Sequence, residues 1–237
     1  MNKRFSGRIG EDYDLFKSIC PYYEDLQNII EQKLFEYSIK NNGIIEVLEI
    51  GCGTGHTTGR ILRASQKISV TAVDNEKIMI EQARISLGLF NFESPRVKFV
   101  LNNAIKYLKS VEDETFDAFA SAFTLHNFER NYREEVLREI YRCLKNRGFF
   151  INSDKYYFGN EKKDKIHSDW QLKQFDKFEE IGRPDLKKEW VNHYLEDEKP
   201  YRKMTEPEQK KLMQEIGFKK IKRIFRKHLE AIITAQK

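Results

Sequence analysis

Four of the chain's 12 glycines lie within nine residues, in the string VLEIGCGTGHTTG at positions 47–59. They are Gly51, Gly53, Gly55 and Gly59, and an apolar run precedes them while a helical pattern follows. Glycine allows the backbone to take positive φ and to approach a ligand closely. The N-terminus of the following helix presents free N–H groups and a positive dipole end. The string therefore predicts a loop that binds an anionic or polar part of a ligand.

The spacing of these glycines narrows the choice of ligand. A dinucleotide fingerprint needs G-x-G-x-x-G, but His56 stands at its third glycine position, and the Gly-Lys-Ser/Thr of a P-loop is missing. The pattern is instead G-x-G-x-G with Glu49 two residues ahead of it. Asp74 ends the next apolar run, 19 residues beyond Gly55, where an acid can accept hydrogen bonds from two ribose hydroxyls. Together these features predict a site for a nucleoside cofactor.

Apolar runs and amphipathic segments alternate along most of the chain. Strands are predicted at 44–50, 67–74, 97–101, 116–123 and 149–154, with helices at 75–87 and 132–144 and a turn at 146–148. Because parallel neighbours require crossover helices, this alternation predicts a doubly wound α/β sheet. A last helix at 206–218 closes at Gly217, and two strands at 219–227 and 228–236 follow so closely that they must be antiparallel.

We expect one domain over residues 1–237. It divides into an N-terminal helical lid (1–43), whose main helix Pro21 opens, a cofactor-binding core (44–154), a helical cap insert (155–205), and the last helix with its β-hairpin (206–237). The insert contains both tryptophans, Trp170 and Trp190, and few aliphatic residues. Such a composition is typical of a cap over a pocket, although a helical decoration that packs its own aromatic residues has the same composition.

Composition excludes several classes of protein. With 40% hydrophobic and 33% charged residues the chain is not disordered. Its three cysteines (Cys20, Cys52 and Cys143) are far apart, which indicates reduced thiols, and no metal site is predicted. There is no apolar run long enough to span a membrane and no apolar leader at residues 1–14, so we expect a cytoplasmic protein. The net charge of +5 comes from interspersed charges, which favours a solvated surface over a nucleic-acid patch.

The E-x-G-x-G-x-G string after the first strand, the acid that ends the second strand, and the seven strands closed by an antiparallel hairpin resemble the class I S-adenosylmethionine-dependent methyltransferases. The resemblance implies a Rossmann-like seven-stranded sheet and S-adenosyl-L-methionine as the cofactor. It covers about residues 20–154 and 206–237. The cofactor-binding residues that it implies are Glu49, Gly51, Cys52, Gly53, Gly55, Asp74, Asn75, Asn103, Ala104, Ala122 and Phe123.

Each of these residues has an implied part. The glycine loop faces the methionine portion of the cofactor, Glu49 orients that loop and the ammonium, and Asp74 holds the ribose. Asn75, Asn103 and Ala104 border the adenine, although many family members have an acid where Asn103 stands. The last two residues, 122 and 123, line the methyl side. Cys52 needs no redox role there, because a buried thiol behaves as a small apolar residue.

A narrower resemblance also exists. The strings CPYYEDLQNII, AVDNEKIMIEQAR and FTLHNFERNYREEVLREIYRCLKNRGFFINSDKY are similar to those of the carboxy-S-adenosylmethionine synthases, a tRNA-modification family of this fold. This resemblance adds Tyr23 as a cofactor contact. That family holds the extra carboxylate with an arginine of the insert, whereas the matching stretch here has only Lys187 and Lys188, which cannot make the same bidentate fork. The comparison favours an ordinary methyltransferase.

Three residues near the predicted carboxyl ends of strands are candidates for catalysis: His126, Asp154 and Tyr156. The methyl of a sulfonium is already activated, so the enzyme mainly positions the acceptor, and a base is needed only if the acceptor arrives protonated. His126 has the side chain suited to that role, and its alternative is a packing or hydrogen-bonded histidine. For Asp154 and Tyr156 the alternative is a loop cap. His167 and His193 are expected on the surface of the insert.

We expect a small-molecule acceptor, because no Asn-Pro-Pro-Tyr string follows the fourth strand and no cysteine stands where a pyrimidine methyltransferase needs one. Two other classes stay open. One is an enzyme acting on RNA, in which the KKIKRIFRK strand follows the phosphates and binding weakens with salt. The other is a non-catalytic partner subunit that keeps the fold as a scaffold. The sequence specifies neither the acceptor nor the oligomeric state.

Overall fold

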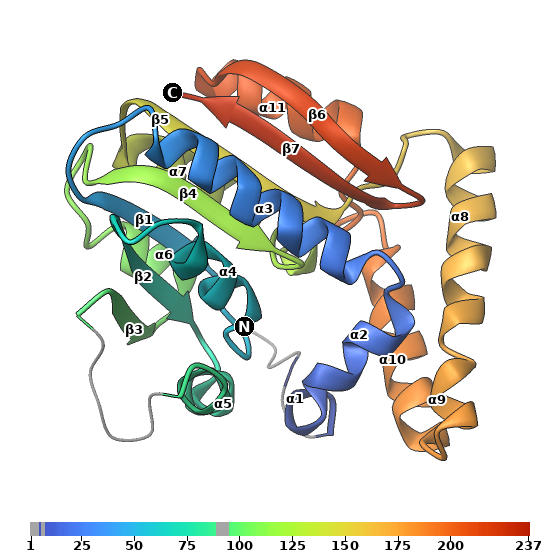
Figure 1. Cartoon of the computed structure of the whole chain (residues 1–237). Helices are drawn as coiled ribbons and strands as arrows, with labels where there is room; N and C mark the ends of the chain where they lie inside the picture. Colours follow the sequence, from blue (N-terminus) through green and yellow to red (C-terminus); the bar gives the residue numbers. More distant parts are fainter. Residues whose placement is uncertain (1–4, 6–7, 89–94) are drawn as a thin grey trace.

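A computed structural model describes residues 5, 8–88 and 95–237, built around one seven-stranded sheet (Figure 1). The strand order is β3-β2-β1-β4-β5-β7-β6. The first five strands are parallel to one another, and β7 is antiparallel to both β5 and β6. The predicted doubly wound α/β sheet with a C-terminal hairpin is confirmed. The strands are β1 (Ile45–Ile50), β2 (Ile68–Asp74), β3 (Val97–Leu101), β4 (Phe116–Ala122), β5 (Leu144–Lys155), β6 (Lys219–Lys227) and β7 (Glu230–Gln236).

Helices cover both faces of the sheet, because its central strands are apolar on both sides. On one face, α3 and α4 pack Leu26, Ile30 and Ile61 against the sheet; on the other, α6, α7 and α11 pack residues such as Leu137 and Met213. Figure 1 shows α3 in front of the sheet and α7 and α11 behind it. The helices flanking the sheet are α3 (Tyr23–Ser38), α4 (His56–Ala64), α5 (Lys77–Ser86), α6 (Ala104–Leu108), α7 (Arg130–Cys143) and α11 (Glu206–Ile216).

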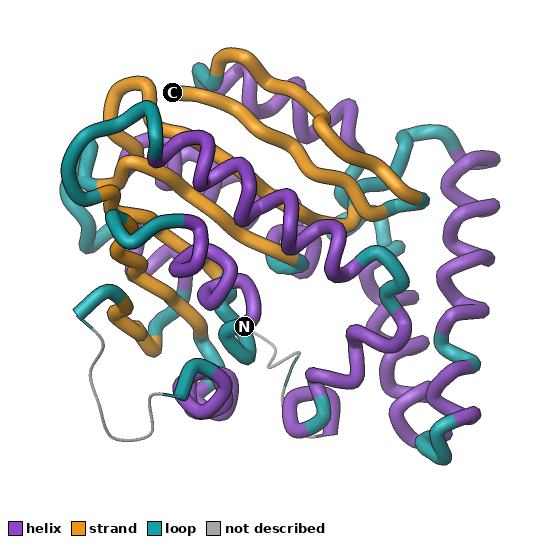
Figure 2. The backbone as a smooth tube through the Cα atoms, viewed as in Figure 1, coloured by secondary structure: helices purple, strands orange, loops and turns teal. Residues whose placement is uncertain are grey.

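Strands and helices alternate as far as β5, after which helices follow one another until the final hairpin (Figure 2). The insert folds as α8 (Glu161–Gln174), α9 (Lys177–Glu180) and α10 (Pro184–Asp197), and the short α1 (Arg8–Glu11) and α2 (Phe16–Ile19) lie at the start of the chain. These segments share a third apolar cluster, in which Ile9 and Ile19 pack with Phe178 and Trp190. In Figure 1, α2 and α10 lie beyond the arrowhead of β4. The insert and the N-terminal segment together therefore cover the carboxyl edge of the parallel strands.

Two predicted boundaries are wrong for identifiable reasons. The turn expected at 146–148 lies inside β5, because Leu144 already pairs with Phe116 before the register shifts and pairing resumes at Phe149. Arg147 lies in this irregular stretch and has a positive φ of +64°. Pro21 precedes α3 rather than opening its first turn, since that helix begins at Tyr23. Residues 1–4 and 6–7 of the expected lid lie outside the described residues.

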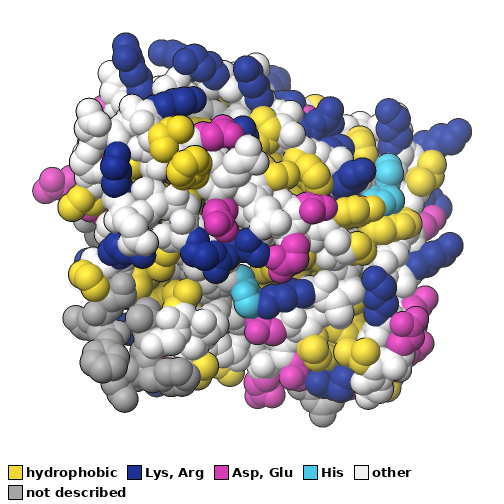
Figure 3. Space-filling view, viewed as in Figure 1, with side chains coloured by type: hydrophobic (Ala, Val, Ile, Leu, Met, Phe, Trp, Pro, Cys, Tyr) yellow, Lys and Arg dark blue, Asp and Glu magenta, His cyan; other side chains and the backbone are white. Residues whose placement is uncertain are grey.

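The described surface adds two further facts. No helix among the described residues has both the length and the apolar character needed to cross a bilayer. Lys and Arg side chains line the upper edge of the face in Figure 3, where the edge strand β6 carries the exposed Lys219, Lys222 and Arg223. Charged side chains on an edge strand hinder its pairing with another sheet, so this basic strand has a structural explanation that needs no nucleic acid.

Candidate functional site

The glycine loop joins β1 to α4 through backbone conformations that favour glycine. Gly51, Gly53 and Gly55 have φ values of +73°, +51° and +84°, and Gly55 is the N-cap of α4. At Gly51 the constraint is also steric, because a Cβ atom there would lie 2.2 Å from Oγ1 of Thr124 in the loop after β4. Any side chain at this position would therefore push the loop after β4 away from the sheet.

Asp74 fixes this loop to the end of β2. Its Oδ2 accepts a hydrogen bond from the Gly53 N–H over 2.9 Å, and its Oδ1 accepts one from the Glu76 N–H over 2.9 Å. Burial raises the pKa of the Asp74 carboxyl, while these two backbone donors oppose the shift. Each carboxylate oxygen keeps a second lone pair. Asp74 can therefore hold the loop and still accept hydrogen bonds from a ligand.

A cavity of about 360 Å³ opens against the loop. Its size is that of a small-molecule site, and seven of the predicted cofactor residues line it: Gly51, Gly53, Asp74, Asn75, Ala104, Ala122 and Phe123. These residues come from the ends of β1, β2 and β4 and from the first turn of α6. The sequence therefore located the wall of this cavity through residues that lie far apart in the chain.

Five predicted residues lie outside the lining of this cavity: Tyr23, Glu49, Cys52, Gly55 and Asn103. Tyr23 lies behind Phe123, with ring centroids 5.9 Å apart and nearly parallel planes. Asn103 is the N-cap of α6 and accepts a hydrogen bond from the Tyr132 hydroxyl over 2.7 Å, whereas its neighbour Asn102 reaches the cavity. Cys52 is 4% exposed. These residues support the wall from behind.

Glu49 is fully buried between β1 and α4. Its Oε2 accepts a hydrogen bond from the Thr58 hydroxyl over 2.6 Å, and burial raises the pKa of its carboxyl to about 8. This bond joins the helix after the loop to the strand before it. It is consistent with the predicted role of Glu49 in orienting the loop. Glu49 does not line the cavity, so a direct contact with a ligand has no support in the described geometry.

Glu76 was missed from the sequence. It lines the cavity two residues after Asp74, is 7% exposed, and its Oε1 has no hydrogen-bond partner within the described part of the chain. A buried carboxylate oxygen without a partner is costly unless a ligand satisfies it. An acceptor beside Asp74 is what the hydroxyls of a ribose require, so this chain's residues fit the nucleoside half of S-adenosylmethionine.

A second, smaller cavity of about 40 Å³ adjoins the first. The two share Phe5, Tyr13, Phe123 and Asn127 as lining residues. Aromatic side chains from the N-terminal segment and the insert, including Phe16, Phe175, Trp190 and Tyr194, form much of the wall of the second cavity. The aromatic residues of the insert therefore do both things that their composition indicates: they pack into a core and they close a pocket.

His126 lines the second cavity, and Asp154 at the end of β5 holds it there. The Asp154 carboxylate also accepts hydrogen bonds from the backbone N–H groups of Leu125 (2.9 Å), His126 (3.3 Å) and Lys155 (2.9 Å), and from the Asn152 side chain (3.2 Å). Because a carboxylate can only accept, Nδ1 of His126 carries the proton. In the neutral imidazole the lone pair is then on the other ring nitrogen, Nε2.

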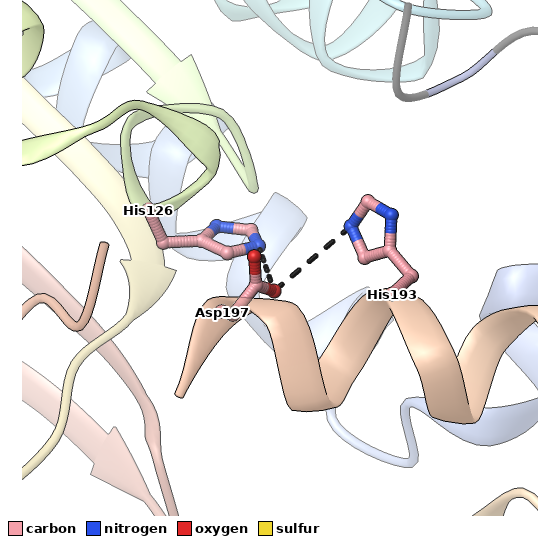
Figure 4. Close-up of side chains that lie close together, drawn as sticks. All are labelled: His126, His193 and Asp197. Carbon is pink, nitrogen blue, oxygen red and sulfur yellow. Dashed lines mark ion pairs between the residues drawn. The ribbon is translucent and has the colours of Figure 1, made fainter. Parts of the chain in front are cut away.

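Nε2 of His126 faces α10. Figure 4 shows Asp197 between the two imidazoles of His126 and His193, with Oδ2 of Asp197 3.6 Å from Nε2 of His126 and 3.9 Å from Nε2 of His193. The expectation that His193 lies on the surface is wrong, since its side chain is only 8% exposed. His193 and Asp197 are four residues apart and so share one face of α10. That spacing, H-x-x-x-D in an amphipathic segment, was the available signal.

Tyr156 does not reach either cavity. It is fully buried, and its hydroxyl accepts a hydrogen bond from Nδ2 of Asn152 over 2.7 Å. The same Asn152 nitrogen donates to Asp154. Tyr156 can therefore influence the site only by positioning Asn152, and through it Asp154.

Comparison with known proteins agrees with this geometry. A sequence family described as a methyltransferase domain matches residues 47–148. The chain is 29% identical to a carboxy-S-adenosyl-L-methionine synthase of Campylobacter fetus over 221 residues, covering 90% of this chain and 85% of that protein. It is 34% identical to a demethylmenaquinone methyltransferase of Leptospira interrogans over 149 residues, covering 62% of this chain and only 57% of that protein.

A solved S-adenosylmethionine-dependent methyltransferase from Archaeoglobus fulgidus shares the fold, with a TM-score of 0.59 at 17% identity over 95% of this chain and all of that one. Fold, site and relatives define an enzyme that uses S-adenosylmethionine. The matched methyltransferase domain, the named relatives and the shared fold support a class I S-adenosylmethionine-dependent methyltransferase.

Proposed function

We propose that the protein transfers the methyl group of S-adenosylmethionine to a small-molecule acceptor held between the two cavities. The observation that carries the proposal is their junction at Phe123 and Asn127, where the glycine-loop cavity meets a pocket with aromatic walls. When bound, the cofactor supplies an activated methyl group. Asp74, Glu76 and Asn102 would hold its nucleoside, and the glycine loop would hold its methionine portion.

In this proposal the chain's own residues position the acceptor and accept its proton. The aromatic walls at Phe16 and Trp190 favour a flat, apolar acceptor at the junction of the two cavities. Asp154 keeps the proton of His126 on Nδ1, so Nε2 is the nitrogen that faces the acceptor and takes its proton. Asp197 lies on the same side of the ring and stabilises the positive charge that this transfer creates.

A carboxylated cofactor is a second candidate, because relatives are named carboxy-S-adenosyl-L-methionine synthase and Arg202 of the insert lines the glycine-loop cavity. The partners of Arg202 argue against it. Its Nη1 donates to the Asn127 carbonyl over 2.7 Å, its Nη2 donates to Glu129 over 3.0 Å, and its Nε lies 3.5 Å from Glu196. Glu129 and Glu196 thus already balance the guanidinium charge that would attract a ligand carboxylate, so we favour methyl transfer.

The test has two arms. Mass spectrometry of small molecules that copurify with the protein distinguishes S-adenosylmethionine, its demethylated product and a carboxylated derivative. Incubation with methyl-labelled S-adenosylmethionine and a small-molecule extract then identifies any product that carries the label. Label in a small molecule is the expected result. A carboxylated ligand, or label found only in RNA, would contradict the proposal.

A further inference from the structure

We infer that His126, His193 and Asp197 form a binding site for a divalent transition-metal ion at the inner end of the second cavity. Each residue offers one ligand atom, and the three atoms lie within 4.8 Å of one another. The set combines two imidazole nitrogens with one carboxylate oxygen from two separate elements, the loop after β4 and the last turns of α10 (Figure 4). The side chains are deeply buried, with exposures of 10%, 8% and 2%.

His126 is already oriented as a metal ligand. Histidines that bind metals donate their other ring N–H to a carboxylate or carbonyl, which fixes the tautomer and raises the basicity of the ligating nitrogen. Asp154 provides this contact at Nδ1, and four further donors hold Asp154 itself. Nε2 therefore points toward Asp197 with its lone pair available.

The three ligand atoms must move closer together to hold one ion. Bonds of about 2.0–2.1 Å to nitrogen and oxygen place neighbouring ligand atoms roughly 2.9–3.4 Å apart in octahedral or tetrahedral geometry. The two nitrogen-to-oxygen separations in the structure are 3.6 and 3.9 Å, and the two imidazole nitrogens lie within 4.8 Å of each other. Imidazole ligands favour Zn²⁺, Fe²⁺, Co²⁺ or Ni²⁺ over Mg²⁺ and Ca²⁺, which prefer oxygen. Three protein ligands leave at least one position of such an ion open.

The surrounding cavity provides a second, independent observation. Gln171 and Glu230 line it, each 6% exposed, and Oε1 of Gln171 and Oε2 of Glu230 have no hydrogen-bond partner within the described residues. A volume of about 40 Å³ is sufficient for one or two water molecules. Water bound to an ion would donate hydrogen bonds, and these two oxygens are acceptors that could receive them.

Two contacts must yield to the ion. The Lys155 ammonium lies 2.7 Å from Oδ2 of Asp197 and neutralises the negative charge of this carboxylate. A bound ion would have to take over that role. Nε2 of His193 lies 3.1 Å from Oδ1 of Asn127, and the proton in that contact must move to Nδ1 before Nε2 can ligate. Competition with Lys155 gives the inference a distinctive consequence, because removing that ammonium should strengthen metal binding.

The role of the ion, though not its binding, rests on the proposed function. With an ion on Nε2, His126 is a ligand and can no longer act as a base. An acceptor hydroxyl bound at the open position of the ion would then have a lowered pKa, and proton transfer to the imidazole would not be needed. Metal binding and methyl transfer are measured separately, so failure of one is distinguishable from failure of the other.

The experiment uses the full chain without an affinity tag, prepared without chelators. Titration with Co²⁺ followed by its visible absorption, and with Zn²⁺ against a chromophoric chelator, measures affinity and stoichiometry. We expect one ion per chain, at least tenfold weaker binding in His193→Ala and Asp197→Asn, unchanged binding in the control His167→Ala, and at least threefold tighter binding in Lys155→Met. Circular dichroism and S-adenosylmethionine binding verify the folding of each variant.

Other outcomes would overturn the inference. Binding that is equal in the wild type, His193→Ala and Asp197→Asn would show that the ion lies elsewhere. No binding in either the wild type or Lys155→Met would mean that the cluster is a purely protein network of ion pairs and hydrogen bonds.

Discussion

The backbone N–H of Gly53 donates a hydrogen bond to Oδ2 of Asp74 across 2.9 Å, and so joins the glycine loop to the end of the neighbouring strand. Two sequence signals 21 residues apart are thus one structural unit. In the proposed function the loop would present backbone to the methionine portion of the cofactor, and the acid would present oxygens to the ribose. Because both line the same cavity, a change at Asp74 is expected to affect two parts of the cofactor at once.

Asp74→Ala is expected to weaken S-adenosylmethionine binding at least tenfold, or about 1.4 kcal/mol. The variant loses the acceptor for the ribose hydroxyls and the contact that fixes the Gly53 backbone. Isothermal titration calorimetry measures the dissociation constant directly. Glu180→Ala, a change of an exposed acid at the end of α9, is the matched control and should bind as the wild type does. Unchanged affinity in Asp74→Ala would mean that the ribose lies elsewhere.

Gly51→Ala should destabilise the protein by about 2–4 kcal/mol. Alanine at φ +73° is strained, and its Cβ would meet the Thr124 side chain at 2.2 Å. Gly43→Ala is the control, because φ is similarly positive at +82° but no atom lies within 4 Å of the added Cβ. We expect that control to lose only about 1 kcal/mol. Equal losses in urea unfolding would show that backbone strain alone, and not the close approach to Thr124, requires glycine at position 51.

The sequence predicted those parts of the molecule that repeat a local pattern. Apolar runs alternating with amphipathic segments predicted every strand of the sheet, and the glycine spacing with Asp74 located the cofactor cavity. These signals are strong because each depends on residues close together in the chain, or on a hydrophobic period that any buried element must keep. The hairpin of β6 and β7 was predictable for the same reason.

The catalytic side of the site was only partly predictable. His126 and Asp154 were singled out because both lie near the carboxyl ends of strands. The H-x-x-x-D spacing places His193 and Asp197 on one helix face, but it does not indicate that this face meets His126. Their contact with His126 spans 67 and 71 residues of chain and depends on the docking of α10. Asn103 was predicted, whereas Asn102 lines the cavity, because strand ends do not specify which of two adjacent side chains faces it.

Glu49→Gln should change how stability depends on pH. Burial raises the pKa of Glu49 to about 8, so the folded protein binds this proton more tightly than the unfolded chain does. The contribution of Glu49 to the free energy of unfolding is therefore complete below about pH 4.5 and is lost as the pH rises through 8. Glutamine does not titrate but can still accept the hydrogen bond from Thr58.

We expect the stability of Glu49→Gln relative to the wild type to increase by at least about 1 kcal/mol between pH 5 and pH 9. Urea unfolding at several pH values measures this difference. Thr58→Val, which removes the hydrogen-bond donor and keeps the carboxyl, is the companion variant. Its stability relative to Glu49→Gln should still fall as the pH rises, as that of the wild type does. Parallel pH profiles for the wild type and Glu49→Gln would contradict a raised pKa at this position.

Trp190→Ala should impair use of the acceptor while leaving cofactor binding intact. Trp190 lines the second cavity and packs against Phe16 at a ring-centroid distance of 5.1 Å, but it does not line the glycine-loop cavity. With the acceptor identified by methyl labelling, we expect KM for it to rise at least tenfold and Kd for S-adenosylmethionine to stay within twofold. Trp170→Ala is the control, since that indole stacks on His228 outside both cavities. A matching rise in Trp170→Ala would reflect a general loosening of the insert.

His126→Ala should lower kcat for the identified acceptor at least 100-fold, because a positioned acid–base group contributes roughly 10²–10⁴ to the rate. His126 lines only the second cavity, so Kd for S-adenosylmethionine should remain within twofold of the wild type. Single-turnover rates at saturating cofactor separate the chemical step from binding and product release. His167→Ala, on α8 and outside both cavities, controls for the loss of an imidazole elsewhere in the protein. If His126→Ala turned over at the wild-type rate, the acceptor would have to arrive already deprotonated, and neither proton transfer nor coordination at Nε2 would be part of the reaction.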